Sequence, residues 1–510
     1  MKNRMKQLTR ASSGAREMPL RVLTGVSVIV ATLGIAGCAV GPDFRIPATD
    51  TPAHWSDWHG GADSLTFPQG DAGGPLPSDI WGAFKDPELL RLIERGRAAN
   101  PDLEIATLHF AEARARETTV STQRGVQVNA TTEASRRRDS EYGANTRILN
   151  IIGGANPAPF LQALGEPYSL YRPGFDASWE LDLWGRLRRS QEVAHGTTEE
   201  QAALLRQSRL SIAADVARNY FALRSTQRQL RLLQGEIEIA DEKVQLLLAQ
   251  EEGGLNDGSA VIRGRQQAAD LRSLTPQLQT KEAQAINQIT QLLGAKPGGL
   301  NAELAISAST ESEPFLPDLK VGVPAEFVRR RPDIAAAEAR LHSATANIGV
   351  AVADLYPRVT LGASFGLESV GAATLRNWGS REWSVGPSIS LPLFDHGRRT
   401  ATITLRKLEQ QEAAVAYQQT ILKAWHEVDD TVSGYSADGQ RCALLAATVT
   451  RSEQEAGLAK VRFEKGITSD LPNLDAQSAL SRAQRDLADG LTQRNVALVA
   501  VYKALGADVE

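Results

Sequence analysis

The sequence predicts a mainly helical, internally duplicated chain that contributes four β-strands to a sheet. Three observations support this fold class. Residues 186–275 and 393–471 contain no proline and are rich in Ala, Leu, Gln, Arg and Glu, which is the composition of long helices. Four short segments alternate apolar and polar residues, the period of a strand with one wet and one dry face. Motifs of the first half recur in the second half at fixed spacing, the mark of an internal repeat.

The N-terminal residues form a targeting segment. Six basic residues precede an apolar run over 22–35 that ends in LGIAGC, which predicts a bacterial export signal over 1–37. About 14 apolar residues are too few to cross a hydrocarbon layer of roughly 30 Å, which needs about 20. IAGC resembles the lipobox of bacterial lipoproteins, in which cleavage leaves the cysteine, here Cys38, as a lipidated N-terminus. Ala39 follows it, and the resemblance then implies sorting to the outer membrane.

Composition excludes several kinds of function. Removal of 1–37, which carries six basic residues and Glu17 and thus a net +5, lowers the net charge from −4 to −9 and argues against a nucleic-acid partner. With Cys38 acylated, Cys442 is the remaining thiol, so no intrachain disulfide is expected and Cys442 is predicted to be packed. The seven histidines are scattered, with no HExxH motif, Cys/His cluster or phosphate-binding loop. We expect no metal, no cofactor and no enzyme activity.

Two spacings define the duplication. NPDLEIATLHFAEARA at 100–115 corresponds to RPDIAAAEARLHSATA at 331–346, an offset of 231. EGGLNDG at 252–258 corresponds to EKGITSD at 464–470, an offset of 212, and LLGA at 292–295 matches ALGA at 504–507 with the same offset. The first copy therefore holds a 19-residue insertion between its two parts. The predicted regions are an N-terminal lipid-anchored segment, a first repeat, a linker and a second repeat: 38–100, 101–295, 296–330 and 331–510.

Each copy is predicted to run helix, strand, strand, long helix, turn, long helix. A helix over 187–251 would span roughly 95 Å, which is typical of coiled-coil packing or a helical tube. Residues 88–120 are predicted to be helical as well. The predicted strands are 126–135, 174–184, 357–367 and 384–393, and the predicted antiparallel helix pairs are 187–294 and 398–507.

The four strands favour a membrane pore over a soluble four-stranded sheet. A sheet in lipid must close on itself, and the smallest closed membrane barrels have eight strands, so one chain must share a barrel with copies of itself. Eight strands leave an interior that side chains fill, whereas twelve leave a lumen. Five carboxylates on the predicted polar faces would crowd a filled interior. We therefore predict twelve strands from three chains, with these carboxylates facing the lumen: Glu133, Asp176, Glu180, Asp182 and Glu368.

Several motifs resemble those of TolC-like outer-membrane efflux factors, specifically the NodT-type lipoprotein branch. They are GCAVGPDF at 37–44, WGAFKDPELLRLI at 81–93, VRRRPDIAAAEARLHSATANIGVAVADLYPRVTL at 328–361, PLFDHGRR at 392–399 and LDAQ at 474–477. The resemblance implies a homotrimer with a twelve-stranded β-barrel in the outer membrane. It also implies a periplasmic α-barrel of twelve long helices. A mixed equatorial collar would be built from parts of 41–100, from 296–330 and from the region around 430–447, so that the N-terminal segment and the linker are equatorial.

The resemblance also implies a gate. The family's narrowest constriction is formed by an Asp in the LDAQ segment and a Leu one turn earlier, here Asp475 and Leu471. A threefold ring of Asp475 would select against anions; the alternative is a solvated carboxylate at a helix end. Ser478 stands where the family often has Arg. Arg263 occupies the position of the first repeat equivalent to Asp475, and we predict a contact between Arg263 and Asp475 of neighbouring helix pairs.

The two helix–helix turns resemble the family's docking tips for a periplasmic adaptor. Glycine permits the tight turn, an exposed Leu or Ile suits a small hydrophobic contact, and the acidic residues suit a basic partner. A turn with an inward-packed aliphatic residue remains the alternative. The residues concerned are Gly254, Leu255 and Asp257 in the first tip, and Gly466, Ile467 and Asp470 in the second.

The expected function is a passive exit duct that carries drugs or small metabolites through the outer membrane. An inner-membrane transporter of the RND type would supply the energy through the adaptor. The nearest alternative is the duct of an ATP-driven type I protein secretion system. An alternative of another class is a structural envelope lipoprotein that uses its long helices as a spacer. Substrates cannot be read from the sequence; all three Met residues lie in the predicted signal, which disfavours a thioether copper path.

Overall fold

The computed structural model describes residues 39–48, 50–52, 54–66, 79–140, 143, 162, 165–305, 315, 317, 327 and 330–506. The predicted signal and Cys38 lie outside the described residues. The chain divides into two compact units. The first comprises 1–43, 119–192 and 346–406, and the second comprises 44–118, 193–345 and 407–510.

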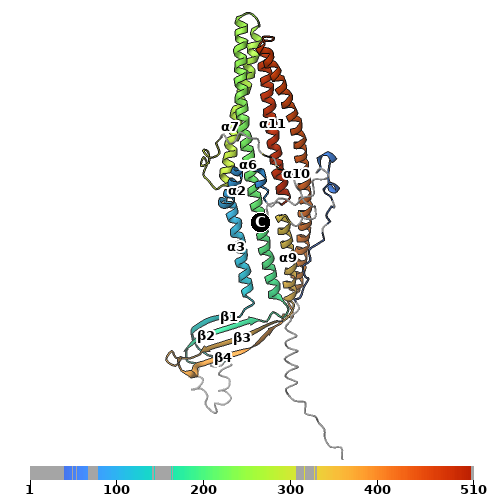
Figure 1. Cartoon of the computed structure of the whole chain (residues 1–510). Coiled ribbons are helices and arrows are strands. Elements are labelled where there is room, and N and C mark those ends of the chain that lie inside the picture. Colours follow the sequence, from blue (N-terminus) through green and yellow to red (C-terminus); the bar gives the residue numbers. More distant parts are fainter. Residues whose placement is uncertain are drawn as a thin grey trace, which may run out of the picture. The chain divides into compact units, whose positions relative to one another are not determined.

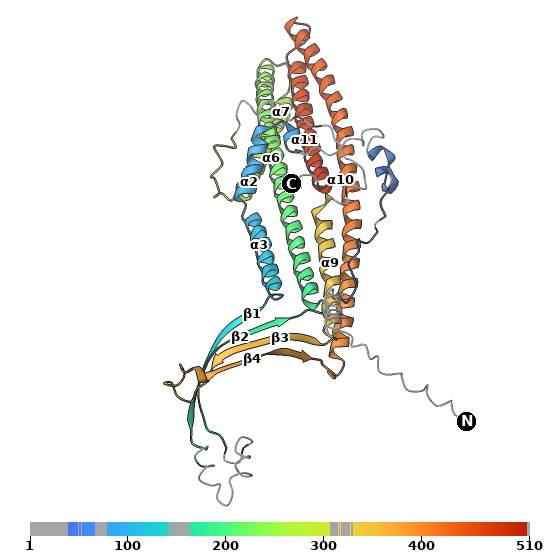
Figure 2. The same cartoon turned by 60° about the horizontal axis from the view of Figure 1, so that its bottom comes forward.

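Four antiparallel strands form one sheet in the first unit (Figures 1 and 2). They are β1 (Gln127–Arg137), β2 (Tyr168–Glu180), β3 (Arg358–Leu367) and β4 (Arg381–Ser390), in the spatial order β1-β2-β3-β4. The prediction of four strands is confirmed, with shifted bounds for the two return strands. β2 ends at Glu180, earlier than the predicted residue 184, because Asp182 has a positive φ of 45°, which a strand cannot continue through.

Four long helices form two antiparallel pairs (Figure 1). The first pair is α6 (Arg186–Glu252) with α7 (Gly258–Leu292), and the second is α10 (Arg398–Glu464) with α11 (Leu471–Ala504). α6 and α10 each have 67 residues, and both their first and their last residues differ by 212. The same offset relates Gly254 and Gly466, which have φ values of 68° and 69°.

Shorter helices precede the strands. They are α2 (Pro87–Ala99), α3 (Pro101–Thr122) and α9 (Pro332–Ala353), and α3 and α9 share the offset of 231. The predicted helix over 88–120 is interrupted at Asn100, whose backbone is extended because Pro101 follows it. The change from 231 to 212 therefore falls between β1 and β2, where the first copy has its longer connection. The 3₁₀ helices are Trp55–Trp58, Asp63–Leu65, Gly82–Phe84 and Trp378–Ser380.

The apolar core lies in the helical unit. One cluster joins α2 to α6, α7 and α11 through fully buried residues such as Leu89, Leu223, Ile289 and Tyr502. A second cluster joins α9, α10 and the end of α11 around Tyr417 and Trp425. A third lies inside the α6–α7 pair, where apolar residues repeat at helical spacing: Leu233, Ile237, Ala240, Ala268, Leu271 and Leu278.

Candidate functional site

One face of the sheet is apolar and uncovered. The strand registers align Phe175, Phe365 and Trp383 in one row across β2, β3 and β4. All three side chains are exposed, as are others on the same face. Large apolar side chains along every strand, with no protein layer over them in the described chain, are typical of a surface that contacts lipid. The exposed residues are Val128, Phe175, Trp179, Leu361, Phe365, Trp383, Val385 and Ile389.

The opposite face is polar, and a register row runs Asn129, Asp176, Ser364, Ser384 across the four strands. Asp176 accepts a hydrogen bond of 3.0 Å from Thr131. The Ser364 and Ser384 hydroxyls lie 2.8 Å apart. A sheet with one polar and one apolar face has the alternation expected of a strand set between lipid and an aqueous lumen.

The predicted carboxylates on this face are mostly paired with arginines. Glu133 accepts a 2.6 Å hydrogen bond from Arg137. Glu180 accepts two bonds, of 2.9 and 2.8 Å, from the guanidinium of Arg186. Glu368 forms an ion pair with Arg172. Asp182 has the Nε of Arg188 3.6 Å from its Oδ2. Arginines therefore offset the negative charge of four of the five predicted residues, and these contacts do not support a strongly negative lining.

Asp182 has another role. It lies in the turn after β2, where its Oδ1 accepts from the backbone N–H of Leu187 at 2.8 Å and its Oδ2 accepts from that of Arg188 at 3.0 Å. These are N–H groups of the first turn of α6 that lack intrahelical partners. The prediction that Asp182 lies in a strand is wrong, because its positive φ ends the strand and its carboxylate accepts from the start of α6.

Two strands have an open edge. Among the strands of the described chain, β1 and β4 each pair with a single neighbour. Their outer backbone N–H and C=O groups therefore need partners from outside these four strands, and in lipid no water can supply them. Because the four strands alternate in direction, β4 of one copy can pair antiparallel with β1 of another.

The two helix–helix tips have the same backbone geometry. Leu255 N–H donates to the Gln250 carbonyl at 2.8 Å, and Ile467 N–H donates to the Arg462 carbonyl at 2.9 Å. With glycine in the left-handed region one residue earlier, each tip is a Schellman motif. The apolar residue of that motif commonly packs back on its own helix. Here Leu255 is 80% exposed and Ile467 68%, so both are free to contact a partner.

The acidic residues at the tips lie beside the helix starts. Asp257 precedes α7 and accepts a 2.6 Å hydrogen bond from Ser259, which lowers the pKa of its carboxyl. Asp470 precedes α11 and accepts a 2.8 Å bond from Asn473. Both carboxyls occupy the position where the helix dipole favours negative charge.

The predicted gate residues lie at the start of α11. Leu471 is its first residue and is half-buried, whereas Asp475 is exposed. Asp475 Oδ1 lies 2.6 Å from Nζ of Lys243 on α6. The predicted contact between Arg263 and Asp475 does not form within this chain, because the exposed Arg263 lies on α7 and Lys243 occupies that position. Sequence reasoning missed Lys243.

A buried carboxylate lies between α6 and α11. Glu236 is fully buried, with Oε2 3.1 Å from Nη1 of Arg485 and Oε1 3.8 Å from Nη2 of Arg482. Neither carboxylate oxygen accepts a hydrogen bond from a described group, so the contact is electrostatic. Sequence reasoning missed Glu236, because a carboxylate in a helix rich in charged residues is normally solvated.

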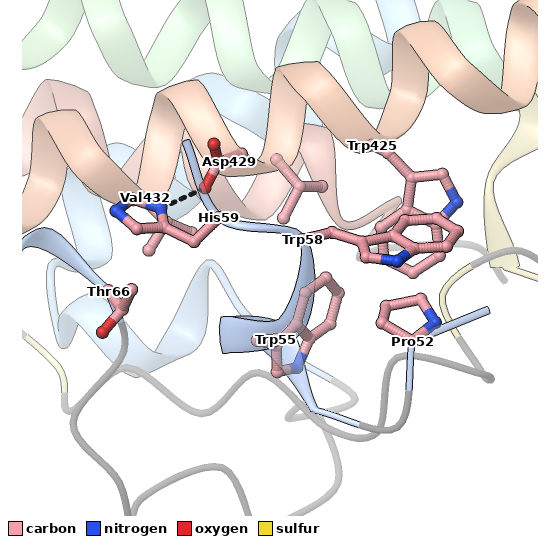
Figure 3. A pocket seen from close by; sticks show the side chains of 9 residues that line it. Pro52, Trp55, Trp58, His59, Thr66, Trp425, Asp429 and Val432 are labelled. Atoms are coloured by element: carbon pink, nitrogen blue, oxygen red, sulfur yellow. Dashed lines mark hydrogen bonds and ion pairs between the residues drawn. The ribbon is translucent and has the colours of Figure 1, made fainter. Parts of the chain in front are cut away.

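The N-terminal segment packs an aromatic cluster against α10 (Figure 3). The ring centroid of Trp425 lies 5.6 Å from that of Trp55 and 5.2 Å from that of Trp58. The cavity here is about 20 Å³, which is room for about one water molecule and too small for an organic ligand. Its lining residues are Pro52, Trp55, Trp58, His59, Thr66, Trp425, Val428, Asp429 and Val432.

Beside the tryptophans, His59 is held by two acceptors (Figure 3). Its Nδ1 lies 2.6 Å from Oδ1 of Asp429, and its Nε2 lies 3.1 Å from the Ala62 carbonyl. Both contacts are satisfied together only when the ring carries two protons. The hydrogen bond with Asp429 raises the pKa of His59.

Other chemistry is not apparent in the part of the chain that is described. No cluster of His, Cys, Asp and Glu there has the geometry to hold a metal ion. No described helix combines the length and apolar character needed to cross a bilayer. Cys442 is buried on α10, and burial raises the pKa of its thiol.

A family model described as "Outer membrane efflux protein" matches residues 92–295 and 323–507. The chain belongs to this family. The two matched segments contain the two repeats of helices and strands. The prediction of an outer membrane efflux factor is confirmed.

Known relatives match along nearly the whole chain. The chain is 31% identical over 492 residues to the outer membrane protein OprJ of Pseudomonas aeruginosa, covering 94% of this chain and 95% of OprJ. It is 29% identical to the probable efflux pump outer membrane protein TtgC of Pseudomonas putida, with coverage of 94% and 95%.

Among solved structures, the outer-membrane channel OprN has a TM-score of 0.78 at 30% identity, covering 92% of this chain and 99% of that chain. The Campylobacter jejuni channel CmeC has a TM-score of 0.77 at 20% identity, covering 93% and 96%, and supports the fold. The efflux protein described here is therefore an outer-membrane channel with a periplasmic portion, rather than an enzyme.

Proposed function

We propose that three copies of this efflux protein close a twelve-stranded β-barrel and continue as a tube of twelve helices. The observation that carries the proposal is the four-stranded sheet with an uncovered apolar face and two open edges. Three chains satisfy both edges by joining β4 of each to β1 of the next. Two chains would close only eight strands, whose interior is filled by side chains, whereas twelve leave a lumen for cargo.

The duct serves as the exit of a tripartite pump. An RND-type inner-membrane transporter supplies the energy, and a periplasmic adaptor docks at the tips around Leu255 and Ile467, whose apolar side chains are exposed. The cargo class is small organic molecules. Relatives of similar length are called a toluene efflux pump protein and an antibiotic efflux pump protein, which supports this class.

The anchor and the gate complete the proposal. Cys38, two residues before the described Val40, carries the lipid that fixes each chain to the outer membrane. Val40 N–H donates to the Trp184 carbonyl at 3.1 Å, which ties this end of the chain to the turn after β2. The constriction is formed by Leu471 and a ring of Asp475, and the contact with Lys243 holds that ring closed.

A deletion strain tests the efflux proposal. Loss of the gene is expected to sensitise cells to antibiotics, solvents and aromatic acids, and the wild-type gene is expected to restore resistance. Unchanged susceptibility across a broad panel would contradict it. Loss of a secreted protein from the medium, with susceptibility unchanged, would favour the duct of a type I secretion system.

A second measurement tests the assembly. Native mass spectrometry of the detergent-solubilised protein is expected to give a trimer. A dimer or monomer under conditions that preserve folding would contradict the shared twelve-stranded barrel.

A further inference from the structure

The contacts between α6 and α11 form a seam with a fixed register. Gln229 donates to Asp489 at 3.3 Å, Glu236 lies 3.8 Å from Arg482, and Lys243 lies 2.6 Å from Asp475. Each step of seven residues forward on α6 is a step of seven residues back on α11. This is the spacing of an antiparallel coiled-coil seam.

The duplication gives each seam residue a counterpart. Adding 212 to the α6 residues gives Arg441, Thr448 and Glu455 on α10, and subtracting 212 from the α11 residues gives Gln277, Asp270 and Arg263 on α7. All six counterparts are exposed in the chain. In the described part of the chain, the faces of α10 and α7 that correspond to the seam are therefore uncovered.

Apolar residues beside the seam show the same difference. Leu474 on α11 is 3% exposed, whereas its counterpart Ile262 on α7 is 69% exposed. Leu246 on α6 is half-buried, whereas its counterpart Leu458 on α10 is exposed. All four residues lie beside the other helix of their own antiparallel pair. The greater burial of Leu474 and Leu246 therefore comes from the contact between α6 and α11. A missing neighbour accounts for the exposure of Ile262 and Leu458.

We propose that the missing neighbour is a second copy of this chain, and that α10 of one copy lies against α7 of the next in the register of the α6–α11 seam. In that register Glu455 forms an ion pair with Arg263 of the adjacent copy, the counterpart of the pair between Lys243 and Asp475. This inference rests on the trimer of the proposed function and adds the helices and residues that join its subunits in the tube.

The reversed charges make the two seams specific. The seam within the chain has its cation on the long helix α6, whereas the seam between chains has its cation on α7. Exchange of partners would place Asp475 against Glu455, or Lys243 against Arg263, and like charges in contact oppose such a pairing. The sign reversal therefore selects α7 as the partner of α10 and leaves Lys243 to hold Asp475.

The middle one of the three contacts differs between the two seams. Within the chain it holds the buried Glu236 and its arginines. Between chains its counterparts are Thr448 and Asp270, which can share a hydrogen bond but not an ion pair. Of the three equivalent contacts between chains, the contact of Glu455 with Arg263 is therefore the one that forms an ion pair.

Chemical cross-linking tests the register. In the full chain, the R263C/E455C variant treated with a short bis-maleimide is expected to give covalent dimers and trimers on a denaturing gel. The control variant R263C/R441C places its second cysteine 14 residues along α10, about 21 Å away, and is expected to stay monomeric on the same gel. The wild-type chain, in which Cys442 is buried, sets the background.

The outcomes separate this inference from the proposed function. Native trimers without cross-linked products from R263C/E455C would overturn the register and leave the shared barrel intact. Absence of trimers in native mass spectrometry would overturn the shared barrel itself. Charge reversal tests the ion pair: R263E is expected to lower the denaturant concentration at which trimers dissociate, and R263E/E455R is expected to restore it. A double variant no more stable than R263E would overturn the ion pair.

Discussion

Replacement of Arg485 by alanine is expected to destabilise the helical unit by about 3–5 kcal/mol, because it leaves the carboxylate of Glu236 buried without its closest countercharge. The two charged atoms lie 3.1 Å apart, and Glu236 is 0% exposed. At an effective dielectric constant of about 20 the attraction at this distance is about 5 kcal/mol. Desolvation of the two ions costs several kcal/mol each and offsets much of that gain, so the intact pair contributes little net stability. Removal of one partner keeps the desolvation cost and loses the attraction.

A neighbouring arginine supplies the matched control. Arg482 lies 3.8 Å from the same carboxylate, but its side chain is 57% exposed. Ion pairs of exposed side chains contribute about 0–1 kcal/mol, so R482A is expected to change stability by no more than that. The E236L/R485L variant removes both buried charges and is expected to be as stable as the wild type, or more stable.

Guanidinium chloride unfolding of the detergent-solubilised protein, followed by helical circular dichroism, measures these differences. The midpoint of R485A should fall well below those of R482A and E236L/R485L, with the slope of the transition unchanged. An R485A midpoint equal to that of the wild type would contradict this prediction, since it would mean that the buried carboxylate does not depend on Arg485.

Three other predictions concern the tips, the N-terminal segment and the start of α6. Leu255→Asp is expected to weaken adaptor binding at least about tenfold in surface plasmon resonance, because burial of a Leu side chain contributes about 1.5–3 kcal/mol. Residues 54–66 are expected to exchange their backbone amide hydrogens faster as the pH rises, once the measured rates are corrected for the intrinsic pH dependence of exchange. The reason is that Asp429 raises the pKa of His59. The stabilisation of this segment by the charged His59 is complete below the ordinary pKa of about 6.5 and is lost as the pH passes the raised pKa. Asp182→Ala is expected to lower stability by about 0.5–2 kcal/mol in the same unfolding assay, because it removes two acceptors at the start of α6.

Conservative or neighbouring substitutions serve as controls for these three predictions. Leu255→Met keeps an apolar tip and should bind the adaptor like the wild type; equal binding by the Asp variant would show that this tip does not dock. His59→Gln should remove the pH dependence, and a dependence that persists would assign it to another group. Asp176→Ala should change stability by less than about 0.5 kcal/mol, as an exposed position does, whereas an equal loss for both aspartates would contradict the special role of Asp182.

The helices and strands could be predicted from the sequence because the duplication supplies the same information twice. The ends of α6 and α10 coincide after a shift of 212, so each tip glycine confirms the other. Alternation of apolar and polar residues located the strands and their two faces, since that pattern depends only on the different environments of the two faces. The turns at the tips follow from their glycines, but the exposure of Leu255 and Ile467 does not, because the apolar residue of this motif commonly packs back on its own helix.

The partners of charged groups could not be predicted in this way. The contact of Lys243 with Asp475 joins residues 232 positions apart, and the register between two helices is set by their packing rather than by the periodicity of either one. Glu236 lies in a helix rich in charged residues, where a carboxylate is normally solvated. Asp182 continues the alternation of β2 by residue type, and only the positive φ that ends the strand reveals its role at the start of α6.

The ionic conductance of the purified full chain in planar lipid bilayers shows whether the protein is a gated passive duct. Discrete single-channel currents are expected for the wild type, and larger currents for D475A, which removes the carboxylate of the proposed gate and its contact with Lys243. Bilayers that stay electrically silent with both proteins, although native mass spectrometry shows trimers, would contradict a duct and favour a structural envelope lipoprotein.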